Sequence, residues 1–271
     1  MLLRMTLLAT LAILGGCATP FPAPAAPGDA RAAVEMLDRS IEAHGGYLFD
    51  EPGSVRVNYA GRWRQMIKVL QPVLVDAGYR KQSEEVLDLS SADLTQTHEG
   101  PDGTKFVART AEDVSVVYDG EESLDETTRA ASALVADAYT MFLSGPSFFR
   151  KREADLSLMD SALRDGESYQ RIHATLRPGF GFSEQDEAIL WINDDTGYLE
   201  LVHFTIEGLA STRGAHVDVA FDDHKEIDGY IWPTSFFERV RGPVRITAHT
   251  WEVLDLTVTE DTDYRARNDS D

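Results

Sequence analysis

The residues best suited by type and spacing to acid–base or metal chemistry form the run Asp222-Asp223-His224-Lys225-Glu226, followed by Asp228. Two carboxylates and an imidazole can bind a metal or transfer a proton only when their side chains converge in a pocket. Neighbours along a strand point to opposite faces, and Asp228-Gly229 is a strong signal for a tight turn. The pattern therefore favours a solvated turn, and a metal-assisted hydrolase that uses Asp222, Asp223 and His224 is the alternative.

The sequence lacks the other common catalytic and metal-binding motifs. It contains no G-x-S-x-G nucleophile elbow, no H-E-x-x-H zinc motif and no G-x-x-x-x-G-K-[ST] phosphate loop. His98-Glu99 is followed by Gly100-Pro101, which favours a turn, and one cysteine cannot form a two-cysteine metal site. The other histidines are scattered over predicted strands, where we expect structural roles: His173, His203, His216 and His249. We predict no catalytic residue, no metal and no cofactor, and the chain is not expected to be an enzyme.

The only cysteine, Cys17, follows a short apolar N-terminus that begins Met1-Leu2-Leu3-Arg4. Residues 1–16 are typical of a secretory signal, since the apolar stretch is shorter than the about 20 residues that span a bilayer. The run Leu14-Gly15-Gly16-Cys17 resembles the lipobox of bacterial lipoproteins. This resemblance implies that Cys17 carries acyl chains such as palmitate, and the following Ala18 favours export to the outer membrane. An ordinary signal peptide with a chance cysteine is the alternative.

The overall charge restricts the partners of the chain. The net charge is −21 at pH 7, and 43% of the residues are hydrophobic, which is enough for a sizeable core. Nucleic-acid binding depends on Lys and Arg neutralising phosphates, so we predict no nucleic-acid partner. The acidity also argues against an electrostatic attachment to anionic lipid, and we expect the acyl chains on Cys17 to provide the membrane contact. Solubility is the expected role of the acidic surface, and loose attraction of divalent cations is the alternative.

The two ends of the chain differ in composition from the middle. Residues 17–28 are rich in proline and alanine, which predicts an extended tether behind the acylated cysteine. Asp29 is suited to cap a helix in which Val34, Leu37 and Ile41 repeat at helical spacing until Gly45-Gly46. Residues 260–271 are polar without a period and form a predicted disordered acidic tail. We therefore expect a single domain over residues 29–259.

In the middle of the chain, alternating apolar residues with turn signals at short intervals predict antiparallel strands. We expect strands over 55–59, 105–109, 114–118, 188–192, 199–206, 216–221, 230–232, 235–240 and 244–258. In the last of these, Ala248, Leu254 and Leu256 are expected to share one face. Residues 65–75 are assigned to a strand broken at Pro72, with a short helix as the alternative, and residues 126–143 show helical spacing. The fold class is α+β and mostly β, with an N-terminal helix and a helix inserted within the sheet.

Large apolar side chains are concentrated at the end of the second predicted helix and in the loop after it. Core packing, the lining of an apolar groove and an exposed contact patch are the three alternatives for them. The candidate lining of an apolar ligand cavity combines these residues with tryptophans on predicted strands: Trp63, Tyr139, Phe142, Phe148, Phe149, Trp191 and Trp232.

The chain resembles LolA/LolB-type carriers and related outer-membrane lipoproteins in three features. These are the order of its elements, the lipobox, and the segments WINDDTGYLELVHF (191–204) and EIDGYIWPTSFF (226–237). That resemblance implies a half-barrel, a single curved antiparallel sheet covered by helices, with an apolar cavity that receives acyl chains. The expected function is a non-catalytic lipoprotein, anchored in the outer membrane and facing the periplasm, that binds a lipid, a lipidated protein or another apolar ligand. An envelope scaffold without a ligand cavity is the alternative, and no oligomeric state is predicted.

Overall fold

The structure is a computed structural model that describes residues 20–24, 26–50, 52–243 and 245–260. The predicted signal, Cys17 and the tail beyond residue 260 lie outside the described residues. The helices are α2 (Ala30–Ala43), α3 (Gln65–Leu70), α4 (Pro72–Val75), α5 (Glu126–Ser144) and α6 (Pro146–Lys151). The strands are β1 (Gly53–Trp63), β2 (Gln82–Asp88), β3 (Leu94–Gly100), β4 (Gly103–Arg109), β5 (Val114–Tyr118), β6 (Glu121–Glu122), β7 (Asp155–Arg164), β8 (Glu167–Leu176), β9 (Asp186–Asn193), β10 (Leu199–Thr205), β11 (His216–Asp222), β12 (Lys225–Ile227), β13 (Tyr230–Trp232), β14 (Ser235–Gly242) and β15 (Ile246–Glu260).

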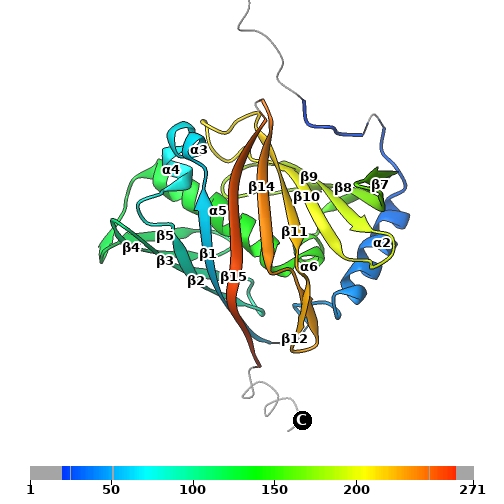
Figure 1. The fold of residues 1–271 in the computed structure, drawn as a ribbon, viewed down its shortest axis with the longest axis horizontal. Helices are drawn as coiled ribbons and strands as arrows, with labels where there is room; N and C mark the ends of the chain where they lie inside the picture. The colour runs from blue at the N-terminus through cyan, green and yellow to red at the C-terminus, as the bar shows by residue number, and fades with distance from the viewer. Residues whose placement is uncertain (1–19, 25, 51, 244, 261–271) are drawn as a thin grey trace, which may run out of the picture.

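Within the described residues, thirteen of the strands form one antiparallel sheet in the order β6-β5-β4-β3-β2-β1-β15-β14-β11-β10-β9-β8-β7. Strands β12 and β13 form a separate hairpin. The sheet curves around α5, which lies across its concave face (Figure 1). The first and last long strands, β1 and β15, pair in the middle of the sheet. The predicted fold class, mostly β with an N-terminal helix and an inserted helix, is confirmed.

Helix α2 begins at the predicted cap. The Asp29 carboxylate accepts a hydrogen bond from the Ala32 amide at 3.0 Å, and the helix ends before Gly45 and Gly46, which both have positive φ. Leu37 and Ile41 are buried as predicted, whereas Val34 is 39% exposed and Ala33 takes its place in the buried stripe.

The variant Asp29→Ala is expected to lower the free energy of unfolding by about 1 kcal/mol, because it removes an acceptor from the first turn of α2. Urea unfolding followed by circular dichroism measures this loss. Glu42→Ala is the matched control, since Glu42 is an exposed residue of the same helix. An equal loss in both variants contradicts a capping role for Asp29.

The strand predicted over residues 65–75 is wrong, because this segment forms the short helices α3 and α4. Ile67 and Val75 are buried against Ala248, while most of the other apolar residues of the segment are exposed. This burial pattern does not have the period of two that a strand packed on one face requires. Pro72 occupies the first turn of α4, where its missing N–H costs no hydrogen bond.

Two bulges in β15 change which of its residues face inward. Ala248 is skipped between the pairs Glu238↔His249 and Arg239↔Thr247, and Leu254 is skipped between Asn58↔Asp255 and Tyr59↔Val253. A bulged residue reverses the alternation of the strand beyond it. The shared face predicted for Ala248, Leu254 and Leu256 is therefore wrong: Leu254 is 63% exposed, while Trp251 and Leu256 join the core.

The proline-rich segment before α2 contacts the sheet where the structure describes it. The Phe21 ring lies 5.0 Å from the ring of His203 on β10 and 5.8 Å from that of His216 on β11. The Gly28 amide donates a hydrogen bond to the Ser157 hydroxyl on β7 at 2.5 Å. Among the described residues, no helix is both long and apolar enough to span a bilayer.

Candidate functional site

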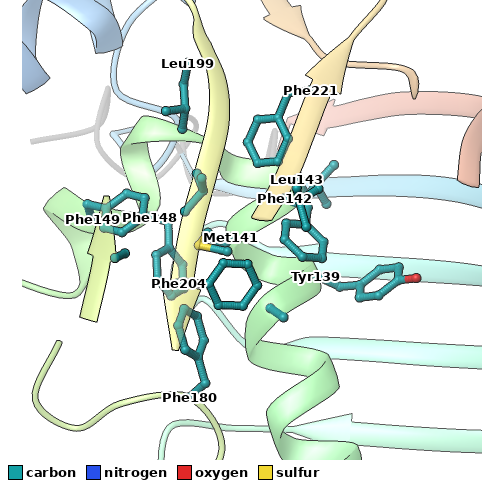
Figure 2. Packing of buried hydrophobic residues seen from close by; sticks show 14 of the residues in the cluster. Tyr139, Met141, Phe142, Leu143, Phe148, Phe149, Phe180, Leu199, Phe204 and Phe221 are labelled. Carbon is teal, nitrogen blue, oxygen red and sulfur yellow. The ribbon is translucent and has the colours of Figure 1, made fainter. Parts of the chain in front are cut away.

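The interior of the molecule is a continuous aromatic cluster between α5 and the concave face of the sheet (Figure 2). Every residue of α5 from Ala131 to Ser144 is buried. Phe142 lies at the centre of the cluster, with ring centroids 5.2–6.2 Å from those of Tyr139, Phe204, Phe221, Phe236 and Trp251. Aromatic pairs at such separations add to the stability that burial provides. The concave face thus presents an apolar surface, and α5 covers it.

The cluster continues toward one end of α5 through Phe148 and Phe149. The Phe148 ring stacks on Phe180 at 5.9 Å, and Phe180 lies 5.2 Å from Phe204. A cavity of about 180 Å³ opens beside this chain of rings, and Phe148 forms part of its wall. Other residues of its wall are Phe49, Thr140, Arg109, Lys151 and Arg152. The Asp137 carboxylate is also part of the wall, so the cavity combines aromatic surface with three cations and one anion.

A buried ion pair fixes α5 next to this cavity. Arg109 on β4 donates two hydrogen bonds to Asp137 on α5, at 2.9 Å from Nε and 3.1 Å from Nη2. The Gly181 amide donates to the same carboxylate at 2.7 Å, and the Gly181 carbonyl accepts from Arg109 at 3.1 Å. Charged groups are tolerated in an interior when they are paired and hydrogen-bonded in this way. The pair joins α5, the sheet and the loop after β8.

A second, polar region lies between α5 and strands β1–β3, around Arg80. The Arg80 guanidinium is buried, donates to the Leu74 carbonyl at 2.9 Å, and lies 5.1 Å and 5.5 Å from the ring centroids of Trp63 and Tyr139. Among the described residues, no carboxylate lies within ion-pair distance of it. The adjoining cavity has about 20 Å³, which fits one water molecule but no acyl chain.

Burial disfavours the charged forms of the titratable groups near Arg80. Burial raises the pKa of the Glu85 carboxyl to about 7, although a hydrogen bond from Ser83 opposes this shift. Burial, together with the nearby positive charge of Arg80, lowers the pKa of His98 and His249 well below the ordinary value. The interior of the sheet at this end thus holds the Arg80 cation among polar groups whose charged forms burial disfavours.

The curved sheet with α5 on its concave face is similar to solved structures. A LolA superfamily protein from Nitrosomonas europaea matches with a TM-score of 0.56 and 12% sequence identity, over 86% of this chain and 96% of that chain. The chain has the LolA-like half-barrel fold. A DUF1329 family protein from Desulfovibrio piger is also similar, with a TM-score of 0.54 and 14% identity over 87% of this chain and 94% of that chain. No family model and no curated protein matches the sequence.

The half-barrel brings together some of the residues predicted to line an apolar cavity. Tyr139, Phe142, Phe148 and Phe149 share the aromatic cluster. Trp232 also belongs to this core, where its indole donates to the Ile227 carbonyl at 3.1 Å.

The other two tryptophans lie apart from that cluster. Trp63 stacks on His249 at 3.8 Å and lines the small cavity at Arg80. Trp191 is half-buried beside Tyr169 and Arg171, and it alternates along β9 with the core residues Leu190 and Ile192. Trp191 therefore points to the convex face of the half-barrel.

The acidic run at the β11–β12 turn does not form a convergent site. Asp222 and Asp223 are exposed, whereas the His224 ring turns toward Tyr198 at 5.0 Å and His44 at 5.9 Å. In the part of the chain that the structure describes, no group of three or more His, Cys, Asp or Glu side chains could hold a metal ion. The predicted turn at Asp228-Gly229 is present, with positive φ at both residues.

Sequence reasoning did not find Arg80, Arg109 or Asp137. Arg109 lies in a predicted strand and Asp137 in a predicted helix, and nothing in the sequence indicates that the two side chains meet. The one usable signal is in β2, where Ser83, Glu85 and the apolar Leu87 alternate on one face. Polar residues in the inward positions of a strand indicate a polar interior.

Proposed function

We propose that this chain is a lipoprotein, anchored in the outer membrane through acylated Cys17, whose half-barrel faces the periplasm and binds a lipid, a lipidated protein or another apolar ligand without catalysis. The observation that carries the proposal is the continuous aromatic surface between α5 and the sheet, which the cavity at Phe148 adjoins. Burying hydrocarbon on such a surface contributes roughly 25 cal/mol per Å². The LolA-like fold supports this function.

The cavity at Phe148 is the proposed entrance. Its 180 Å³ is below the roughly 300 Å³ at which ligand pockets begin, so a ligand must widen it by displacing α5 or α6. Lys151, whose ammonium lies over the Phe49 ring, is placed to meet a negatively charged end of the ligand, while the Phe148 and Phe49 rings meet its apolar part. Arg152 is held by the Asp137 carboxylate at 3.9 Å and by the Pro178 and Gly179 carbonyls. The ligand class that fits best is therefore an amphiphile with an anionic head.

The proposal is tested by uptake of an apolar fluorescent dye into the chain carrying Cys17→Ser, and by native mass spectrometry for co-purified lipid. Ala111→Trp is expected to weaken uptake at least tenfold, about 1.4 kcal/mol, by filling the cavity from an exposed turn. Glu112→Trp, in the same turn but outside the cavity wall, is the matched control. Equal uptake by both variants contradicts this entrance. No uptake and no co-purified lipid contradicts ligand binding and favours the scaffold.

The anchor is tested separately. Labelling of cells with a radioactive fatty acid is expected to mark the wild-type chain and to leave Cys17→Ser unlabelled. Fractionation of the labelled membranes reports whether the chain resides in the outer membrane.

A further inference from the structure

The helices α3 and α4 expose an unusual number of apolar side chains. Met66, Val69, Leu70 and Val73 are 58%, 70%, 53% and 43% exposed, within ten residues of chain. The helices themselves are fixed, because Ile67 packs on β15 in a separate small core and the Arg64 amide donates to the Ala248 carbonyl at 2.9 Å. Exposed apolar side chains that are concentrated on a well-packed element indicate a contact surface.

The charge of this surface is opposite to that of the whole chain. Residues 62–75 contain Arg62, Arg64 and Lys68 and no carboxylate, although the net charge of the chain is −21. The β10–β11 loop adds the exposed Arg213, and the β14–β15 turn adds the exposed Arg245. None of these cations forms an ion pair among the described residues. We call α3, α4 and these cations the basic apolar tip.

Three segments that connect strands meet at the tip: the α3–α4 segment, the β10–β11 loop and the β14–β15 turn. The Gln71 side chain between α3 and α4 donates to the Ser211 carbonyl of the β10–β11 loop at 2.8 Å. Val75 shares a small core with Ala248, against which Val240 of β14 and Ile246 of β15 also pack. Figure 1 shows α3, α4, this loop and the β14–β15 turn together at the top of the molecule.

The N-terminal segment reaches the same end of the sheet. Phe21 packs on His216, which is the first residue of β11 and pairs with Gly242 at the end of β14. Figure 1 shows the described N-terminal segment beginning near the tip. Cys17 is three residues before Pro20, so an extended chain separates their Cα atoms by at most about 11 Å. Acyl chains on Cys17 therefore hold a lipid surface close to the basic apolar tip.

We propose that the basic apolar tip docks on the anionic phospholipid surface that holds the acyl chains, with the exposed apolar residues of α3 and α4 inserted among the headgroups. This inference rests on the anchor proposed above. Three observations favour an anionic lipid surface as the partner of the tip: the short spacer to Cys17, the local positive charge and the exposed apolar residues. Each Lys or Arg at an anionic membrane surface contributes about fivefold in affinity, and the anchor keeps the tip at high local concentration. Docking fixes the orientation of the half-barrel relative to the membrane.

The test supplies the anchor chemically, so that it does not depend on natural acylation. The chain beginning at Cys17 is coupled through its only thiol to a maleimide phospholipid in vesicles of phosphatidylcholine with phosphatidylglycerol. Hydrogen–deuterium exchange is then compared with that of the uncoupled chain in solution. We expect the amides of residues 65–75 to exchange several-fold more slowly on the vesicles. The β7–β8 hairpin at the opposite end of the sheet, with Leu163 78% exposed, is the internal control and is expected to be unchanged.

Two sets of surface variants separate the charge from the apolar contact. The first variant removes three positive charges: Arg62→Gln, Lys68→Gln and Arg213→Gln. The second removes two apolar side chains: Val69→Ser and Leu70→Ser. In each variant, residues 65–75 are expected to exchange on vesicles as fast as in solution. Arg31→Gln, a highly exposed cation on α2, is the matched control and is expected to retain the protection.

Equal exchange on vesicles and in solution overturns the proposal. So does protection that appears in solution at high protein concentration without lipid, because it assigns the tip to a second copy of the chain. If residues 65–75 are protected equally on vesicles of phosphatidylcholine alone, the proposed attraction between the cations of the tip and anionic lipid is overturned. The mass of the N-terminal peptide from cells reports natural acylation independently, so a failure of the anchor is distinguishable from a failure of the tip.

Discussion

Replacing Asp137 with alanine is expected to lower the free energy of unfolding by about 3–5 kcal/mol, because the change leaves the buried Arg109 guanidinium without its counter-charge. Arg109 keeps only the carbonyls of Asp113 and Gly181, at 3.2 Å and 3.1 Å, as acceptors. The Gly181 amide also loses its acceptor. Urea unfolding at pH 7 measures the loss, which is large relative to the about 5–15 kcal/mol that stabilises a typical domain.

The double variant Arg109→Met with Asp137→Leu separates the penalty of an unpaired charge from the value of the pair. Apolar residues of similar volume often replace a buried ion pair without loss, so the double variant is expected to be more stable than Asp137→Ala. Asp113→Ala, which removes the exposed partner of Arg129, is the control and is expected to cost about 0–1 kcal/mol. A double variant as unstable as Asp137→Ala contradicts this explanation.

The features predicted from sequence are those set by short-range chemistry. Asp29 caps α2 because its carboxylate accepts an amide in the first turn, and Asp228-Gly229 forms a tight turn because both residues adopt positive φ. The strict alternation near Val217 marks β11, since one face of that strand is apolar. In each case, the residues that determine the structure are neighbours along the chain.

Other elements were missed because tertiary contacts decide them. Strands β2 and β3 place Glu85, Gln96 and His98 inward, so they lack the apolar alternation by which strands are found. The bulges at Ala248 and Leu254 depend on pairing with β14 and β1, and neither residue type indicates a bulge.

The candidate site was predictable in composition but not in arrangement. The aromatic concentration near Phe142 is visible in the sequence, while its contacts with Phe204 and Phe221 come from strands more than sixty residues away. The net charge of the chain likewise gives no information on how the charged residues are arranged in the fold, because it sums over all of them. The acidic total argued against an electrostatic membrane contact, yet the end of β1, the β10–β11 loop and the β14–β15 turn, which carry Arg62, Arg213 and Arg245, lie at one end of the molecule.

The variant Glu85→Gln is expected to make the protein more stable above pH 7 and to have little effect near pH 4. The pKa of Glu85 is about 7 in the folded chain and 4.5 in the unfolded chain, because burial penalises the carboxylate. Between these values the folded chain holds a proton that the unfolded chain releases, so the wild type loses stability as the pH rises. The pKa difference corresponds to about 3 kcal/mol, fully lost above pH 7. Glutamine is neutral at every pH and avoids this loss.

Urea unfolding of both proteins at intervals from pH 4 to pH 8 measures the difference. The lowered pKa values of His98 and His249 reduce the stability of both proteins at acidic pH, so this contribution largely cancels in the comparison. Glu84→Gln, an exposed neighbour on the opposite face of β2 that pairs with Arg56, is the control and is expected to change the free energy of unfolding by no more than about 1 kcal/mol. If the advantage of Glu85→Gln does not grow between pH 4.5 and 7, Glu85 is ionised in the folded protein. The region around Arg80 would then be an ion-pair network and not a cation among polar groups whose charged forms burial disfavours.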